Sequence, residues 1–83
     1  MYDNNIKTYV AVDVLFDDAG RMTPLAVTWD DGRVFPIDRV LEVRRAASRK
    51  AGGQGVRYTC RIKGNVTYLY YEDPRWFVER KGA

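Results

Sequence analysis

Histidine is absent from the 83-residue sequence, and Cys60 is the single cysteine. Histidine is the most frequent general base and metal ligand in proteins, so its absence excludes most familiar catalytic and zinc-binding arrangements. One cysteine cannot form an internal disulfide, and here no histidine is present to activate it as a nucleophile. We therefore expect a protein that is not an enzyme and that uses no metal or other cofactor.

Segments that direct a chain to a membrane are missing as well. No apolar run approaches the roughly 20 residues that a membrane-spanning helix needs. The opening residues, MYDNNIKTYV, lack the basic start and the apolar stretch of a signal peptide. Because a lone cysteine also suits a reducing compartment, the sequence predicts a cytoplasmic protein without membrane contact.

Acidic residues are lacking from one long section of the chain, residues 43–71. Residues 1–42 hold eight acids and four bases, and residues 72–83 hold three of each. The formal net charge of +3 therefore hides a strongly positive central section. Such a local excess of charge attracts anionic partners whatever the net charge of the whole chain. The seven basic residues of this section are Arg44, Arg45, Arg49, Lys50, Arg57, Arg61 and Lys63.

Alternation of apolar and polar residues, the pattern of β-strands, recurs along most of the chain. A chain of 83 residues has the size of one domain with a modest core. The sequence thus predicts a single all-β domain over residues 1–83, in which about six antiparallel strands curl into a small barrel or half-barrel. The predicted strands cover residues 6–16, 24–29, 33–43, 56–62, 66–72 and 76–80.

The segment TWDDGRVF predicts a β-hairpin. A three-residue loop over residues 30–32, with Gly32 in the left-handed conformation, keeps the apolar side chains of both strands on one face. A two-residue loop would divide them between the two faces. Beyond this hairpin the apolar phase changes near residues 38–39, which predicts a bulge or a bend. The side chains assigned to the apolar face are Leu25, Val27, Phe35 and Ile37.

A second hairpin is predicted from VRYTCRIKGNVTYLYYE. Gly64-Asn65 fits a two-residue type II′ turn, which needs glycine first, and this register pairs Cys60 with Leu69. The face that contains Cys60 is apolar, so we expect this cysteine to be an inert buried thiol. The residues assigned to the core face are Tyr58, Cys60, Ile62, Leu69 and Tyr71.

Residues 38–52 also permit a helix, with Asp38 as its N-cap and Gly52 at its end. The apolar residues in this segment do not follow a helical stripe, so we favour a strand up to residue 43. After it we expect a mobile, basic, glycine-rich loop over residues 44–55, the longest section without an apolar pattern.

Gly52-Gly53-Gln54 is the tripeptide that translation termination factors use to release a peptide. Their loop resembles Gly-Ala-Gly-Gly-Gln with an asparagine three positions later, whereas here Lys50 and Arg57 occupy the first and last of these positions. The glycines also precede a predicted strand, whereas a phosphate-binding loop leads into a helix. We interpret the tripeptide as coincidental and keep peptidyl-tRNA hydrolysis as a remote alternative.

The outer face of the second hairpin combines arginines with tyrosines. Such side chains dominate many protein interfaces, and they also bind the phosphates and bases of single-stranded nucleic acid. We predict a non-catalytic interaction module that contacts a protein partner or a second copy of itself. Single-stranded or structured nucleic acid, bound through residues 44–63, is the alternative. The predicted binding residues are Arg44, Arg45, Arg49, Lys50, Arg57, Arg61, Lys63, Tyr68 and Tyr70.

Two acidic pairs, Asp17-Asp18 and Asp30-Asp31, fall in predicted turns. Aspartate is favoured in turns because its carboxylate accepts hydrogen bonds from nearby backbone amides. A divalent cation would need further oxygen ligands to converge on them. We therefore assign these aspartates a role in turn formation.

The order TWDDGRVFPIDRVLEVRRAASRKAGGQGVRYTCRI followed by YLYYEDPRWFVE resembles a family of short bacterial proteins of unknown function. The resemblance covers about residues 25–79. It implies a compact all-β domain. The family has no assigned activity, so the resemblance implies no substrate or partner.

Overall fold

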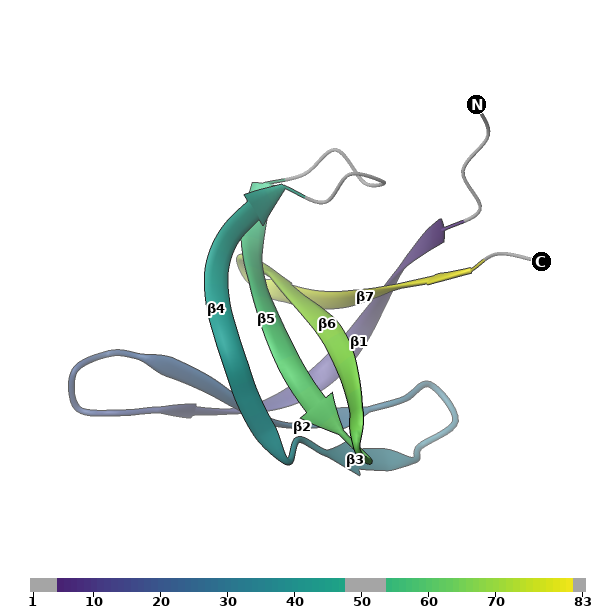
Figure 1. The fold of residues 1–83 in the computed structure, drawn as a ribbon, viewed down its shortest axis with the longest axis horizontal. Helices are drawn as coiled ribbons and strands as arrows, with labels where there is room; N and C mark the ends of the chain where they lie inside the picture. The colour runs from purple at the N-terminus through teal and green to yellow at the C-terminus, as the bar shows by residue number, and fades with distance from the viewer. Residues whose placement is uncertain (1–4, 48–53, 82–83) are drawn as a thin grey trace.

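Seven antiparallel strands form one sheet that curls into a half-barrel (Figure 1). The computed structural model describes residues 5–47 and 54–81, and these form strands and turns only. The order of the strands in the sheet is β3-β2-β1-β7-β6-β5-β4. The predicted all-β half-barrel is therefore confirmed. The strands are β1 (Asn5–Phe16), β2 (Met22–Thr28), β3 (Val34–Pro36), β4 (Arg39–Ala47), β5 (Gln54–Ile62), β6 (Asn65–Glu72) and β7 (Arg75–Lys81).

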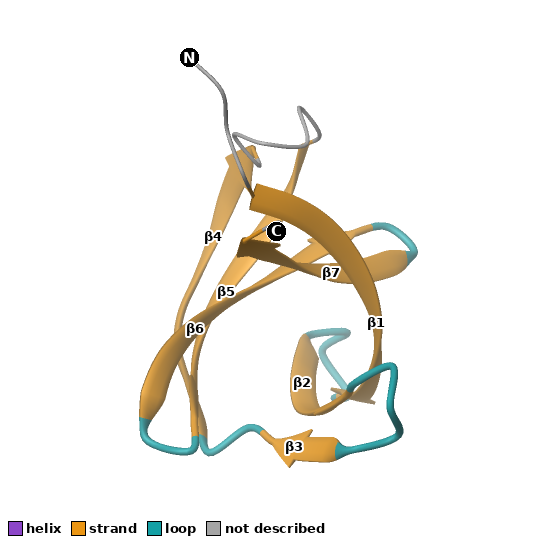
Figure 2. Ribbon diagram, turned by 90° about the vertical axis from the view of Figure 1, so that its right-hand side faces the viewer, coloured by secondary structure: helices purple, strands orange, loops and turns teal. Residues whose placement is uncertain are grey.

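The two edge strands of the sheet, β3 and β4, are separated by only two residues of the chain. The amide of Ile37 donates to the Leu25 carbonyl of β2 at 2.9 Å, and the amide of Asp38 donates to the Arg61 carbonyl of β5 at 2.8 Å. Two successive residues thus donate hydrogen bonds to β2 and to β5, which lie near opposite edges of the sheet. These bonds bring β3 and β4 together at one end of the half-barrel (Figure 2). The predicted break near residues 38–39 is confirmed, and it divides the predicted third strand into two.

The helix alternative is wrong, because residues 39–47 pair with β5 as an antiparallel strand. The predicted loop is also too long at both ends, since β4 continues to Ala47 and β5 begins at Gln54. Glycine at position 55 permits the start of β5 to lie close to β6, because a Cβ there would lie 2.7 Å from the Tyr71 carbonyl oxygen. Residues 48–53, the centre of the predicted loop, lie outside the described residues.

The loop of the β2–β3 hairpin has the predicted length. Gly32 has φ +88°, and the Trp29 amide donates to the Arg33 carbonyl at 2.8 Å across the three-residue loop. Val27 then opposes Phe35, as the apolar pattern requires. Register in this hairpin is therefore set by the apolar side chains and by the glycine at the left-handed position.

Leu25 does not take its predicted place on the apolar face. The pairing of β1 with β2 shifts between Asp13 and Val14, so Leu25 has no residue opposite it in β1. Pro24 and Val27 are buried on either side of this irregularity, whereas Leu25 is 47% exposed. A bulge of this kind moves the following residues to the other face, and it also bends the sheet.

The β5–β6 hairpin turns one residue earlier than predicted. Its loop is Lys63-Gly64, with φ values of 51° and 78°, and not Gly64-Asn65. Two successive positive φ values are the signature of a type I′ turn, whose twist matches that of the flanking strands. The register is shifted by two residues, so each side chain keeps its predicted face although the pairs change. The observed pairs include Tyr58 with Leu69, Cys60 with Thr67 and Arg57 with Tyr70.

Lys63 is the non-glycine residue with positive φ among the described residues, and this conformation predicts a stabilising substitution. Asparagine tolerates the left-handed conformation better than lysine, so Lys63→Asn should raise the free energy of unfolding by about 0.5–1 kcal/mol. Urea denaturation followed by circular dichroism measures the change. Lys63→Gln is the control, because it removes the charge and keeps the unfavourable backbone. An equal gain in the glutamine variant would contradict the backbone explanation.

The core lies inside the curl of the sheet and is built around aromatic rings. The Trp76 ring centroid lies 5.1 Å from that of Tyr58 and 4.8 Å from that of Tyr71. Cys60 and Leu69 have no exposed surface. The predicted burial of Tyr58, Cys60 and Leu69 is thus confirmed. The buried core cluster consists of Val27, Tyr58, Cys60, Leu69 and Trp76.

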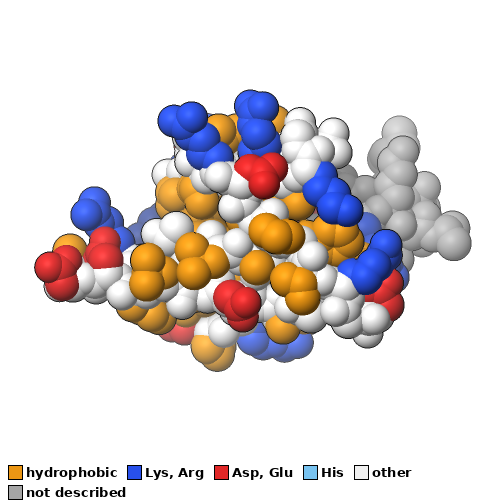
Figure 3. Space-filling view, turned by 90° about the horizontal axis from the view of Figure 1, so that it is seen from below, with side chains coloured by type: hydrophobic (Ala, Val, Ile, Leu, Met, Phe, Trp, Pro, Cys, Tyr) orange, Lys and Arg blue, Asp and Glu red, His pale blue; other side chains and the backbone are white. Residues whose placement is uncertain are grey.

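So small a core leaves many apolar side chains at the surface. Figure 3 shows several of them across the face seen from below, with lysine and arginine side chains towards its margins. Phe16 is 67% exposed and Val66 is 58% exposed. Within residues 5–47 and 54–81 there is no helix with the length and hydropathy of a membrane span.

Candidate binding face

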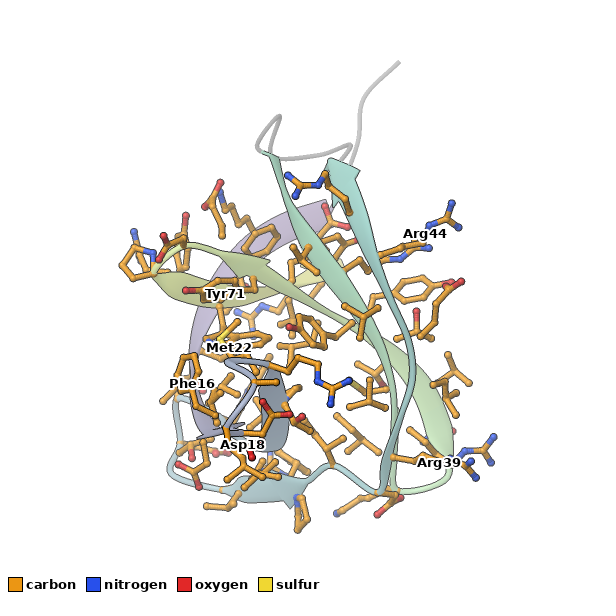
Figure 4. All side chains as sticks on the ribbon, turned by 90° about the vertical axis from the view of Figure 1, so that its left-hand side faces the viewer. Phe16, Asp18, Met22, Arg39, Arg44 and Tyr71 are labelled. Atoms are coloured by element: carbon orange, nitrogen blue, oxygen red, sulfur yellow. The ribbon has the colours of Figure 1, made fainter. Side chains whose placement is uncertain are left out.

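Four arginines, a valine and a tyrosine share the outer side of β4, β5 and β6. Residues directly opposite each other in a ladder project to the same side of a sheet, so the pairing places these side chains together. Figure 4 shows Arg39 and Arg44 pointing away from the interior on this outer side. We call this surface the arginine–tyrosine face. Its residues are Arg39, Arg44, Arg57, Arg61, Val66 and Tyr68, and Glu42 and Thr59 lie among them on the same side.

Arg57 occupies the centre of the arginine–tyrosine face. Its side chain is 24% exposed, and its guanidinium carbon lies 4.6 Å from the centre of the Tyr68 ring. One guanidinium nitrogen lies 3.9 Å from a carboxylate oxygen of Glu42, at the outer limit for an ion pair. Arg57 is therefore held over Tyr68 with only a weak contact to a carboxylate.

Two polar atoms at this centre lack a hydrogen-bond partner. Among the described residues, the buried side-chain atoms without one are Nε of Arg57 and Oγ1 of Thr59. Thr59 lies opposite Tyr68 in the ladder, so both atoms belong to the same part of the outer surface. Buried polar groups without a hydrogen bond destabilise a fold, so the packing beneath Arg57 and Tyr68 is less favourable than that of the inner core.

Arginines face each other twice across β4 and β5. Arg44 opposes Arg57, and Arg39 opposes Arg61. Like charges directly opposite each other in a sheet are destabilising. Within the described part of the chain no carboxylate forms an ion pair with Arg39, Arg44 or Arg61. An anionic partner would remove this repulsion.

Tyr70 is not part of the exposed face, contrary to the prediction. It is 7% exposed, and its ring stacks on Phe77 with 4.9 Å between centroids and 5° between planes. Burial raises the pKa of its hydroxyl. The ring of Tyr9 meets Phe77 edge-on at 5.9 Å. Tyr70, Phe77 and Tyr9 are cross-strand neighbours, so they form a second aromatic cluster in a row across β6, β7 and β1 on the outer side of the sheet.

Two cations cover this second aromatic cluster. The Arg75 guanidinium carbon lies 3.3 Å from the centre of the Tyr9 ring, and Lys7 Nζ lies 4.6 Å from that of Phe77. Lys7 is paired with Glu72 at 2.8 Å, and this hydrogen bond raises the pKa of Lys7 and lowers that of Glu72. These cations are therefore committed to structural contacts.

The remaining predicted binding residues are dispersed. Lys63 lies at the hairpin turn with Nζ 5.0 Å from the centre of the Phe35 ring, away from the arginine–tyrosine face. Arg45 is exposed and opposes Val56, a residue that packs against the core, so it belongs to the other side of β4. Arg49 and Lys50 lie outside the described residues. Of the predicted set, the structure therefore brings together Arg44, Arg57, Arg61 and Tyr68.

Arg39 completes the face and was not predicted. Arg39 belongs to the face because it lies opposite Arg61, and this pairing is known only once the β4–β5 register is known. That register includes an irregularity between Val40 and Glu42, and simple alternation along the sequence does not locate it.

The tripeptide of the predicted loop is only partly described. Gln54 begins β5, while Gly52 and Gly53 lie outside the described residues. Because β5 begins at position 54, the two glycines directly precede a strand, as predicted. The arrangement of the tripeptide as a whole is outside the part of the chain that the structure describes.

The acidic turns have the predicted local role. Asp17 accepts hydrogen bonds from the amides of Ala19 and Arg21, and Asp31 accepts one from the amide of Arg33. Backbone hydrogen bonds are the main cause of the lowered pKa of both carboxyls. No group of three or more acidic or cysteine side chains in residues 5–47 and 54–81 is arranged to hold a metal ion.

Comparison of the chain with models of known families, with curated proteins and with solved structures finds no significant match. The arginine–tyrosine face must therefore be interpreted from its own chemistry. The resemblance to short bacterial proteins stays a prediction.

Proposed function

We propose that the protein is a non-catalytic binding module whose arginine–tyrosine face contacts an acidic surface of a partner protein. The observation that carries the proposal is the set of outward-facing arginines on β4 and β5, of which Arg39, Arg44 and Arg61 have no ion pair within the described residues. Arginine and tyrosine supply much of the binding energy in protein interfaces, and carboxylates satisfy guanidinium groups through paired hydrogen bonds. With its single buried thiol, such a module suits a reducing cytoplasm.

A second copy of the chain fits this face poorly. A two-fold symmetric interface places the same patch of each copy against the other. Here it would bring the exposed arginines of one copy against those of the other, with Glu42 as the acid available nearby. Repulsion of this kind disfavours self-association through the arginine–tyrosine face, so a different and acidic protein is the better partner.

Nucleic acid is the second candidate, because the two arginine–arginine pairs also suit a chain of phosphates. Three features favour protein instead. The face contains arginine and no lysine, a composition typical of protein interfaces. It lies on the convex side of the sheet (Figure 1), and its one exposed ring, Tyr68, already carries Arg57 at 4.6 Å. Little aromatic surface is left for bases to stack on.

Affinity capture with the full chain tests the proposal. The immobilised protein is incubated with a nuclease-treated extract of its cell of origin, and bound proteins are quantified by mass spectrometry. Tyr68→Ala should weaken the affinity of the purified partner about 30-fold, because an exposed interface tyrosine is a frequent hot spot. Arg61→Glu should weaken it about tenfold by replacing attraction with repulsion.

Leu15→Ala and Arg21→Glu are the matched controls, since both side chains are exposed and lie near the β1–β2 turn. They should leave the affinity unchanged. A captured protein whose affinity is equally insensitive to Tyr68→Ala and to Arg61→Glu would refute the proposed face. Binding of a labelled 20-nucleotide strand that weakens steeply between about 50 and 200 mM salt, and that is lost in Arg61→Glu, would establish the second candidate instead.

A further inference from the structure

A cavity of about 370 Å³ opens on the inner side of the half-barrel. Val27, Phe35, Ile62, Leu69 and Val78 give it apolar walls, and Trp29 stands beside them. These residues come from the β2–β3 hairpin and from three strands on the opposite side of the curl. Pockets of this size and character hold ligands or single large side chains.

The wall of this cavity contains a gap between two strands. The ladder between β6 and β7 ends at Tyr70 and Phe77, so residues 65–69 and 78–81 are not paired with each other. Figure 2 shows the two strands diverging from their common turn. Thr67 and Val78 line both the inner cavity and a second hollow of about 290 Å³ beside Tyr68. In this gap the side chains of Thr67 and Val78 therefore lie between the inner cavity and the outer hollow.

The diverging part of β6 is an edge to which another strand can add. In an antiparallel ladder, main-chain groups point alternately to the two neighbouring strands. Asn65, Thr67 and Leu69 are paired with β5 within the register that begins at the hairpin turn. By the same alternation, the main-chain groups of Val66 and Tyr68 point towards the side from which β7 has diverged. An extended peptide binds such an edge through its own main chain.

Three cations lie against the two aromatic rings, Phe35 and Trp29, that line the cavity. The Arg33 guanidinium carbon lies 5.5 Å from the centre of the Phe35 ring, and Lys63 Nζ approaches the same ring at 5.0 Å. The Arg80 guanidinium carbon lies 5.6 Å from the Trp29 ring. Arg33 is bonded through Nε to Asp31 at 2.7 Å. Asp31 offsets the charge of Arg33, so Lys63 and Arg80 supply the net positive charge beside the apolar walls, and Glu79 lines the outer hollow.

We propose that the gap between β6 and β7 binds an extended acidic peptide segment of a partner protein. The peptide adds to the free edge of β6 and places one aromatic or large aliphatic side chain in the cavity. Its flanking aspartates or glutamates meet Arg33, Lys63 and Arg80. The main chain supplies affinity, and the cavity and the cations supply specificity. The site uses the main chain of Val66 and Tyr68 and the inner cavity but none of the arginines of the arginine–tyrosine face, so it does not depend on the proposed function of that face.

Selection from a random library of ten-residue peptides displayed on phage tests the proposal with the full chain as target. The expected result is enrichment of sequences with one large apolar residue between acidic residues. A synthetic peptide of the enriched sequence is then titrated into ¹⁵N-labelled protein. The amide signals of Thr67 and Val78 and the indole signal of Trp29 should shift, whereas those of Arg39 and Arg61 should not.

Variants at the mouth of the cavity separate this site from other basic surfaces. Arg33→Glu combined with Arg80→Glu should weaken the peptide roughly tenfold, since two attractions become repulsions. Arg21→Glu is the matched control, because Arg21 contacts Asp17 in the same way as Arg33 contacts Asp31. Arg61→Glu should also leave the peptide affinity unchanged, so loss of one site does not imply loss of the other.

Three outcomes would overturn the proposal. The first is enrichment no greater than on the Thr67→Trp variant, whose new ring fills the gap. The second is enrichment of sequences without acidic residues or without an apolar anchor. The third is a set of shifted signals confined to the arginines Arg39, Arg44, Arg57 and Arg61. If Thr67→Trp fails to fold, the pair Arg33→Glu and Arg80→Glu, both at exposed positions, serves as the comparison in its place.

Discussion

Trp76→Ala should lower the free energy of unfolding by about 3–5 kcal/mol, the cost of removing a buried tryptophan side chain. Trp76 is 7% exposed and stands between the rings of Tyr58 and Tyr71. Its loss leaves a cavity between side chains of β5 and β6, and the surrounding structure relaxes only partially to fill such a cavity. A domain of this size has a total stability of about 5–15 kcal/mol, so the variant should lie close to unfolding at room temperature.

Urea denaturation followed by circular dichroism measures this loss, and Trp29→Ala is the matched control. Trp29 is half-buried and lines the open cavity, so its truncation should cost clearly less, about 1–2 kcal/mol. Trp76→Phe keeps an aromatic ring and should fall between the two if the alanine variant is unfolded. Equal losses for Trp76→Ala and Trp29→Ala would contradict the assignment of the core to the β5–β6–β7 side.

Much of this fold follows from local rules that operate within a hairpin. A strand exposes alternate residues to opposite sides, so the core positions of Tyr58, Cys60 and Leu69 could be predicted from alternation alone. The loop at Gly32 could be predicted because one register keeps the apolar side chains together and the other scatters them. The turn between β5 and β6 was predicted one residue too late, but the predicted faces remained correct, because a register shift of two residues keeps each side chain on the same face.

The errors arose where partners distant in sequence decide the outcome. Leu25 is exposed because β1 and β2 slip against each other, and neither strand alone reveals the slip. Tyr70 is buried because its cross-strand neighbour Phe77, in β7, stacks against its ring. Alternation assigns a residue to a side of a sheet, but it does not tell which strands will cover that side. Arg39 was missed for a related reason, since its partner Arg61 is set by a register that no single segment specifies.

The two proposed surfaces divide the basic residues between the two sides of the sheet. Arg39, Arg44 and Arg61 lie on the outer side, whereas Lys63 is directed to the Phe35 ring beside the inner cavity. The prediction placed Lys63 in one binding surface with the arginines of β4 and β5, because all of them lie in the same acid-free section of the chain. In the folded chain a hairpin turn sends neighbouring residues to different environments, so a block of positive charge in a sequence need not form one surface.

The stability of the protein should fall as the pH rises above about 8.5, with Cys60 as a main cause. Burial in the apolar core raises the pKa of the Cys60 thiol to about 11, while an unfolded chain has a thiol pKa of about 8.5. Between these values the unfolded state loses the proton and the folded state keeps it, so each rise in pH favours unfolding. Below pH 8.5 both states hold the proton and the thiol has no effect on the pH dependence. The expected loss is about 2 kcal/mol between pH 7 and pH 10.

Cys60→Ala isolates this contribution, because the tyrosines that also titrate in alkali are common to both proteins. At pH 7 the variant should be less stable than the wild type by about 1–2 kcal/mol, the cost of removing a buried sulfur. Urea denaturation at pH 7, 8, 9 and 10 should show this difference shrinking with pH and reversing near pH 10, since the variant has no thiol to deprotonate. A difference that stays constant over this range would show that the thiol is accessible to solvent and would contradict its place in the centre of the core.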